Sequence, residues 1–166
     1  MKLTFLTAAA FCAATAVFAH EYKVKDITVD HPMIFETAKS AKVAGGYLRL
    51  TNTGPTADTL IAVSADFAPR IELHLSETDD LGVARMTKQE GGIAIPAGES
   101  VTLQPGGLHV MFMGLDGEPL VAGDKIDATL VFEDAGALDV TFNVEARDAD
   151  DHKAMDHGEM GHDHDS

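Results

Sequence analysis

"PGGLHVMFMGL", residues 105–115, shows a pattern that recurs along the chain: a turn followed by a short apolar run. A Pro-Gly-Gly turn releases the chain into a short apolar run, which is typical of a β-strand. Successive side chains of a strand point to opposite faces, and we place Val110 and Phe112 in the core. The opposite face then carries His109, Met111 and Met113.

Similar short runs, rich in Val, Ile, Thr and Phe and divided by Gly, Pro, Asn and Asp, continue along the chain. Residues 32–44 are the one stretch that could form one or two turns of helix. Regularly spaced short strands predict an all-β, antiparallel Greek-key sandwich in one domain. The predicted strands lie within residues 23–29, 45–52, 59–65, 70–76, 82–86, 91–98, 100–107, 108–115, 124–134 and 138–146.

The two ends of the chain differ from this middle part. Residues 1–19 combine a basic Lys2, an apolar run and a small residue, Ala19, before the expected cleavage site, as in a secretory signal peptide. The run is short for a membrane span, so we expect no membrane insertion. Residues 20–146 form the predicted sandwich domain, and residues 147–166 are too polar to bury a core, which predicts a disordered tail. We expect a soluble, periplasmic monomer.

Composition excludes several classes of function. The single cysteine, Cys12, lies in the predicted signal peptide, so the mature chain has no thiolate for a zinc finger, an iron–sulfur cluster or a blue-copper centre. Removing Lys2 with the signal changes the formal charge from −15 to −16. Such a chain is a poor partner for nucleic acid and a good one for cations. No sequence motif of a hydrolase or phosphate-binding loop is present, and we expect no enzymatic activity.

The histidines and methionines indicate which cation. Met111 and Met113 could be ordinary gap-fillers of a β core, but His109 on the same face argues against that reading. Thioether sulfur is a soft neutral donor that favours Cu(I), and imidazole suits both oxidation states of copper. Zinc has little use for methionine. His74 and Met86 stand at the ends of two other predicted strands. These residue types therefore point to copper.

Residues 70–115 also resemble the spaced signature of the PCu(A)C-type periplasmic copper chaperones. His74 stands first, Leu75 replaces the Met that usually follows, and Met86 comes after ten intervening residues. The 22 residues between Met86 and His109 are one more than the family's usual gap, and we place the extra residue in the turn at 90–92. His109-Val110-Met111 completes the pattern.

This resemblance spans roughly residues 24–146 and implies a cupredoxin-like β-sandwich that binds Cu(I) through His74, Met86, His109 and Met111. It also implies delivery of copper for cytochrome oxidase assembly, to the oxidase copper subunit directly or through a Sco-type thiol protein. Because the extra residue could shift Met86 relative to His109, Met86 is less secure than the two histidines. Met113 shares the ligand face and could substitute.

The tail is an independent indication of copper. Imidazoles among carboxylates suit Cu(II), and methionines add capacity for Cu(I). A flexible tether would raise the local concentration of these groups near the sandwich site. The alternative is an acidic tail that only keeps the protein soluble. The candidate tail ligands are His152, Met155, His157, Met160, His162 and His164.

Three other functions fit parts of the sequence. A copper-sequestering or resistance protein would use the same ligands for storage. A histidine-brace oxygenase would use His20 as the mature N-terminus and His31 as second ligand, although no aromatic substrate platform is evident. His31-Pro32-Met33 is otherwise a peripheral copper contact or plain loop structure. A metal-free adhesive sandwich would show no copper-dependent stabilisation.

Overall fold

The computed structural model describes residues 21–79 and 81–147, and every regular element among them is a β-strand. The all-β prediction is thereby confirmed. Val, Ile, Thr and Phe recur at alternate positions of these strands, as expected for sheets with one buried face. The strands are β1 (Glu21–Val24), β2 (Ile27–Phe35), β3 (Val43–Asn52), β4 (Asp58–Ser64), β5 (Arg70–Thr78), β6 (Ala84–Lys88), β7 (Ile93–Ile95), β8 (Ser100–Leu103), β9 (Leu108–Met113), β10 (Lys125–Phe132) and β11 (Gly136–Glu145).

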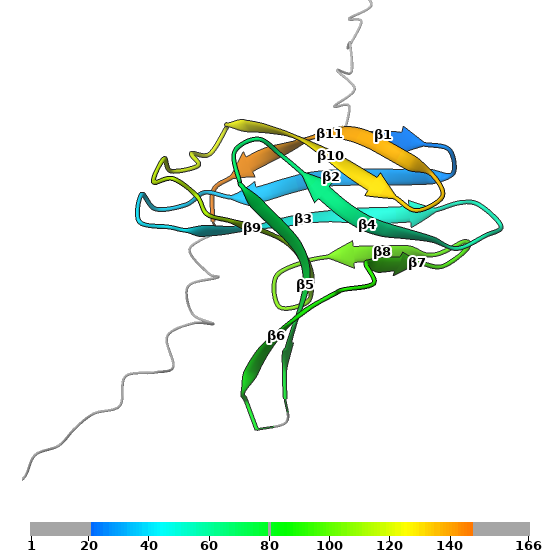
Figure 1. The fold of residues 1–166 in the computed structure, drawn as a ribbon, viewed down its shortest axis with the longest axis horizontal. Helices are drawn as coiled ribbons and strands as arrows, with labels where there is room; N and C mark the ends of the chain where they lie inside the picture. Colours follow the sequence, from blue (N-terminus) through cyan, green and yellow to red (C-terminus); the bar gives the residue numbers. More distant parts are fainter. Residues whose placement is uncertain (1–20, 80, 148–166) are drawn as a thin grey trace, which may run out of the picture.

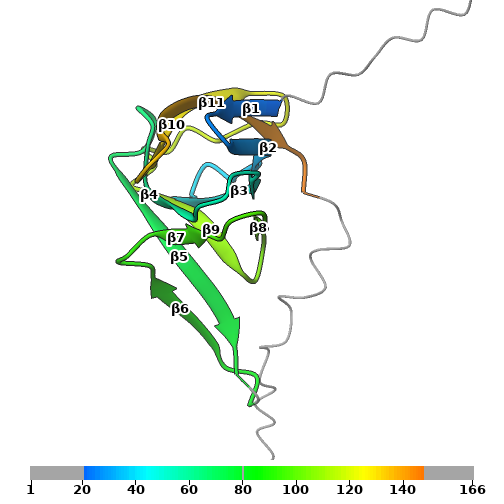
Figure 2. The same cartoon turned by 90° about the vertical axis from the view of Figure 1, so that its right-hand side faces the viewer.

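The strands form one folded sheet in the order β6-β5-β9-β3-β2-β11-β10-β4-β7, with β1 added to β2 and β8 added to β3. The sheet turns back on itself, so that β1, β2, β10 and β11 lie over β3, β8 and β9 (Figures 1 and 2). All the described strand pairs are antiparallel except β2 with β11, which is parallel. The resulting sandwich is therefore mixed, whereas the sequence predicted an antiparallel one.

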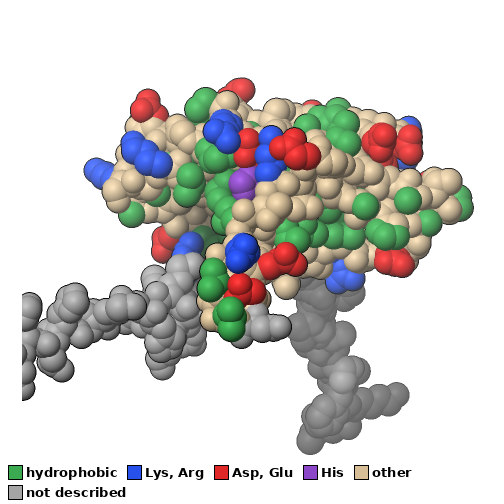
Figure 3. Space-filling view, turned by 60° about the horizontal axis from the view of Figure 1, so that its bottom comes forward, with side chains coloured by type: hydrophobic (Ala, Val, Ile, Leu, Met, Phe, Trp, Pro, Cys, Tyr) green, Lys and Arg blue, Asp and Glu red, His purple; other side chains and the backbone are tan. Residues whose placement is uncertain are grey.

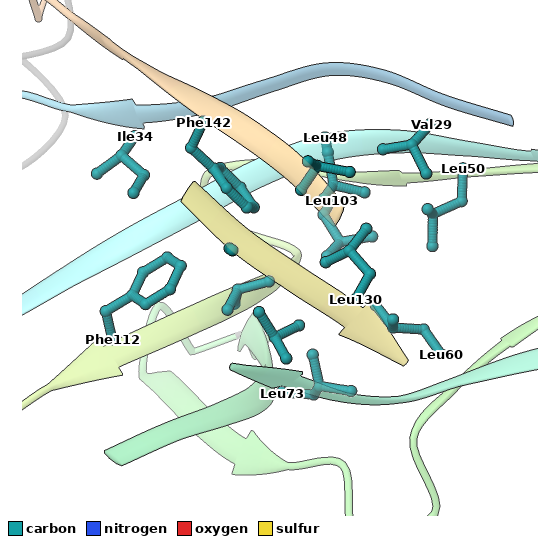
Figure 4. Packing of buried hydrophobic residues seen from close by; sticks show 14 of the residues in the cluster. Val29, Ile34, Leu48, Leu50, Leu60, Leu73, Leu103, Phe112, Leu130 and Phe142 are labelled. Atoms are coloured by element: carbon teal, nitrogen blue, oxygen red, sulfur yellow. The ribbon is translucent and has the colours of Figure 1, made fainter. Parts of the chain in front are cut away.

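The core lies between the two layers, and β9 contributes to it as predicted. Val110 and Phe112 are fully buried. Phe112 meets Phe142 of β11 edge to face, with ring centres 5.8 Å apart, and Ile34 of β2 packs in the same cluster (Figure 4). Each large side chain buried in this way contributes about 1.5–3 kcal/mol to stability. Because Val110 and Phe112 point into the core, the side chains at the alternate positions of β9 point to the opposite face.

The β5–β6 hairpin projects from the sandwich as an arm (Figures 1 and 2). All five residues of β6 are exposed, and among the described strands β6 is the end strand of the sheet, paired only with β5. Asp79 shapes the connection by accepting hydrogen bonds from the backbone of Leu81 and Val83, at 3.0 and 2.9 Å. The arm thus places the side chains of β6 beside β5 and leaves them exposed.

Two details of the sequence reading were wrong. Residues 23–29 form two strands, because the chain turns at Lys25 and Asp26, where Lys25 adopts a φ of 50°. Residues 32–44 contain no helical turn, since β2 continues to Phe35 and pairs with β3. Within residues 21–79 and 81–147, no helix long and apolar enough to cross a membrane is found.

Candidate metal centre

The register of β5 and β9 brings two histidines together. His74 lies directly opposite His109, and their ring centres are 5.9 Å apart with the planes inclined at 52°. A metal-bound imidazole nitrogen lies about 2.0–2.1 Å from the ion, so two imidazoles sharing one ion have ring centres about 5–6.5 Å apart. The observed separation therefore fits one ion held between His74 and His109.

Two methionines lie on the same side of the sheet. Met111 follows His109 by two residues on β9 and is half-buried, while Met86 of β6 lies opposite Ser76 of β5 and is 52% exposed. Paired residues of adjacent strands share a face, which places both thioethers on the histidine side. Met86, His109 and Met111 line one cavity of about 280 Å³, and His74 adjoins it through His109.

The extra residue in the spaced signature does not separate Met86 from the histidines. The turn at Gln89–Gly92, closed by a hydrogen bond from Gly92 N to Gln89 O of 3.0 Å, follows β6 and leaves its register with β5 intact. Met86 consequently reaches the same cavity as His109. Met86, His109 and Met111 therefore share one cavity, and His74 lies beside it, opposite His109.

Met113 and His31 lie elsewhere. Met113 pairs with Arg70 and Val43, further along the sheet, and does not line the cavity. His31 adopts a φ of 50° in an irregular part of β2, and its Nε2 lies 3.1 Å from a carboxylate oxygen of Glu145. It is thus part of a strand bulge, with its imidazole beside a carboxylate, and not a loop. His20 and all six candidate ligands of the tail lie outside the described residues.

Both imidazoles are oriented by hydrogen bonds. Nδ1 of His109, a residue only 5% exposed, lies 3.0 Å from the carbonyl oxygen of Gly107. Since a carbonyl only accepts, Nδ1 donates, and Nε2 of the neutral ring keeps its lone pair. Nε2 of His74 lies 2.9 Å from Oε2 of Glu72, whereas its Nδ1 is buried and has no hydrogen-bond partner among the described residues.

Glu72 is held between His74 and two cations. Its Oε1 lies 2.9 Å from a guanidinium nitrogen of Arg70 and 3.5 Å from Nζ of Lys88. The hydrogen bond from His74, helped by Arg70 and Lys88 and opposed by desolvation, lowers the pKa of Glu72 to about 2. Glu72 is therefore an ionised acceptor at neutral pH. The spacing Glu72-x-His74 on one strand face is the signal by which the sequence could have identified it.

An aromatic wall, formed by Phe35 and Tyr47, borders the cavity on the side of Met111. The two rings are 5.6 Å apart, and the guanidinium carbon of Arg147 lies 5.3 Å from the centre of Phe35. Burial raises the pKa of Tyr47, against the smaller opposing effect of Arg147, so this phenol stays neutral. A Cβ on Gly45 would lie 2.9 Å from Cζ of Tyr47, so glycine lets the ring cover β3.

The donors that converge at this place are imidazoles and thioethers. Within the part of the chain that the structure describes, no group of three or more His, Cys, Asp or Glu side chains is arranged to hold a metal. On the face seen in Figure 3, a histidine lies among hydrophobic side chains, with Lys or Arg and Asp or Glu side chains close by. Two neutral nitrogens and two thioether sulfurs suit Cu(I) and are poor ligands for hard divalent cations.

Comparison with known proteins places the chain. Residues 27–144 match the family model described as "Putative lipoprotein LpqE-like". The chain belongs to this LpqE-like family. A protein of Leifsonia xyli subsp. xyli (strain CTCB07), named "Putative lipoprotein Lxx21020", is 38% identical over 93 residues. That match covers 56% of this LpqE-like chain and 55% of the relative, so the chain spans about half of the relative's length.

Solved structures of PCuAC domains share the fold. The copper-bound PCuAC domain from PmoF2 matches with a TM-score of 0.66 at 27% identity, over 77% of this chain and 99% of that domain. The apo PCuAC domain from PmoF1 gives 0.64 at 29%, over 77% and 100%. CuI-DR1885 from Deinococcus radiodurans gives 0.57 at 28%, over 80% and 85%. The resemblance to PCuAC-type chaperones, expected from the spaced signature, is thereby confirmed, together with the cupredoxin-like sandwich.

Proposed function

We propose that this protein is a copper carrier of the cell envelope, which binds one Cu(I) ion through His74, Met86, His109 and Met111. The observation that carries the proposal is that Met86, His109 and Met111 line one cavity, while His74 lies opposite His109 with the ring centres 5.9 Å apart. The copper-bound and CuI forms of the PCuAC structures described above support copper as the cargo.

The exposure of the site favours transfer over storage. Copper leaves such a site by ligand exchange, in which donors of an acceptor displace the thioethers one at a time. Met86 is 52% exposed on an edge strand, so an incoming donor can reach it without any rearrangement of the core. A storage site would gain from burying all its ligands. We infer that the acceptor is a cytochrome oxidase copper subunit or a Sco-type thiol protein, and that the carrier is not an enzyme.

We further propose that the tail is a capture arm for Cu(II) in the periplasm, reached through the signal peptide of residues 1–19. The position of Arg147 supports this, because the last described residue lines the cavity that Met86, His109 and Met111 share. His152 is five residues further on, and a chain spans at most about 3.3–3.6 Å per residue, so its imidazole stays within roughly 20 Å of the rim. The first of the tail ligands named above is therefore within reach of the Cu(I) site.

The first test is Cu(I) stoichiometry measured by competition with a chromogenic chelator. A chain of residues 20–146, which contains the whole core, should bind one Cu(I), and His109→Ala or Met111→Ala should abolish tight binding. Met113→Ala is the matched control, because it removes a thioether from the same strand outside the cavity. If the 20–146 chain binds no Cu(I), the proposed site is refuted.

A second measurement separates the two metal sites and the two fates of copper. Under oxidising conditions, the chain of residues 20–166 should bind more Cu(II) than the chain of residues 20–146. The Cu(I)-loaded protein should transfer its ion to a copper-free oxidase subunit or Sco-type protein. Retention of the ion in the presence of a tighter-binding acceptor would favour sequestration instead.

A further inference from the structure

Among the described residues, Glu72 contacts the proposed ligand His74 directly, and the two oxygens of its carboxylate have different partners. Oε2 faces Nε2 of His74 at 2.9 Å. Oε1 faces Arg70, with distances of 3.1 Å to Nε and 2.9 Å to a terminal nitrogen, and Lys88 at 3.5 Å. The two cations therefore fix the carboxylate, and one oxygen remains for the imidazole.

This arrangement determines which nitrogen of His74 carries the proton. A carboxylate paired with two cations is an acceptor only, so Nε2 of His74 must donate to it. In a neutral imidazole the other nitrogen then has a free lone pair. That nitrogen, Nδ1, is buried and has no partner in the described part of the protein. A buried acceptor without a partner is uncommon in folded proteins and calls for an explanation, such as a missing ion.

His109 has the opposite arrangement. Its Nδ1 donates to Gly107 O at 3.0 Å, which leaves Nε2 as the free nitrogen. The two opposed histidines of β5 and β9 thus leave different ring nitrogens available for an ion, Nδ1 in His74 and Nε2 in His109.

We propose that Glu72 is a positioning residue of the copper site: it holds His74 in the tautomer that binds the ion through Nδ1, while His109 binds through Nε2. This inference rests on the proposed function, because it assigns a role around the same ion. A histidine that ligates a metal commonly donates its other N–H to a carboxylate, which orients the ring and raises its basicity. Arg70 and Lys88 keep Glu72 itself from acting as a ligand.

The test combines nitrogen NMR with copper affinity. Long-range proton–nitrogen correlation spectra of the metal-free protein should show Nε2-protonated His74 and Nδ1-protonated His109. Adding Cu(I) should shift Nδ1 of His74 and Nε2 of His109. Glu72→Ala should abolish the preference of His74 for one tautomer and lower Cu(I) affinity by about 10–100-fold, the range for loss of such a partner.

Two further variants distinguish positioning from general effects of charge or folding. Glu72→Gln keeps a carbonyl oxygen that can accept from His74, so it should retain the tautomer and recover most of the affinity. Glu77→Ala removes an exposed carboxylate of the same strand, three pairs beyond His74, and should change affinity by less than about twofold.

The outcomes separate this inference from the function on which it rests. If the wild-type protein binds no Cu(I), the proposed function fails and the positioning role fails with it. If the wild type binds Cu(I), but His74 binds through Nε2 or Glu72→Ala binds as tightly as Glu77→Ala, only the role of Glu72 is overturned.

Discussion

Substituting Gly46 by alanine would test the packing that orients β9. A Cβ at this position would lie 2.6 Å from Cε2 of Phe112 and 3.2 Å from Cε1 of Phe142, so the aromatic pair must move. Overpacking at such a contact costs about 2–3 kcal/mol, and replacing a strand glycine returns about 0.5–1 kcal/mol of chain entropy. We expect Gly46→Ala to lower the free energy of unfolding by about 1–2.5 kcal/mol.

The assay is urea unfolding of the metal-free protein, followed by circular dichroism. Gly91→Ala is the matched control, because its Cβ meets nothing within 4 Å, and it should be neutral or stabilising by up to about 1 kcal/mol. Trimming the obstructing ring provides a second check. In a double-mutant cycle, Phe112→Leu should cost less in the Gly46→Ala background than in the wild type.

A Gly46→Ala protein as stable as Gly91→Ala would refute this account of the core. The same substitution should also weaken Cu(I) binding, because Phe112 directly follows Met111 on β9 and points to the opposite face, so a shift of its ring moves the backbone that carries Met111. If Gly46→Ala weakens Cu(I) binding but leaves the free energy of unfolding unchanged, the Phe112 ring has moved without a cost in stability and has displaced the copper ligands.

Three further substitutions test other features. Asp58→Asn leaves the buried N–H of Ala135 without its carboxylate acceptor and should cost about 2 kcal/mol at neutral pH. Burial opposes ionisation of Asp58, but three backbone N–H donors and Lys25 outweigh it and lower the pKa of this carboxyl below 3.8. The stability advantage of the wild type over Asp58→Asn is therefore full above about pH 4 and is lost as the pH falls through the folded-state pKa. Urea unfolding at several pH values measures this dependence. Met86→Leu should lower Cu(I) affinity about tenfold or more, or about 1.4 kcal/mol, in chelator competition, with little change in stability. Leu81→Ser, at a side chain 89% exposed, should change the unfolding free energy by less than about 0.5 kcal/mol.

Alternation within strands made part of the site predictable. The period of two placed Val110 and Phe112 in the core and His109 and Met111 on the other face, and the structure agrees. Alternation alone could not exclude Met113, since its separation from the site depends on where the cavity ends. The position of β3 and β6 beside β9 and β5 determines where the cavity ends. The register between these strands cannot be read from the alternation within one strand.

Side chains from distant strands were harder to foresee. Phe35 and Tyr47 reach the cavity from β2 and β3, and no local pattern relates them to His109. No aromatic platform was evident in the sequence, whereas the fold builds an aromatic wall from these two residues. The division of residues 23–29 into two strands was missed because Lys25 has a positive φ, a backbone conformation that residues other than glycine seldom adopt.

The edge position of β6 has a mechanical consequence. Three of the four proposed ligands lie on β5 and β9, each of which has neighbours on both sides, whereas Met86 lies on a strand hydrogen-bonded on one side only. An ion shared by Met86 and β9 would serve as a second tether for the arm, in place of the missing neighbouring strand. Filled and empty carriers would then differ in the stiffness of the arm, which an acceptor can sense before any bond to the ion is exchanged.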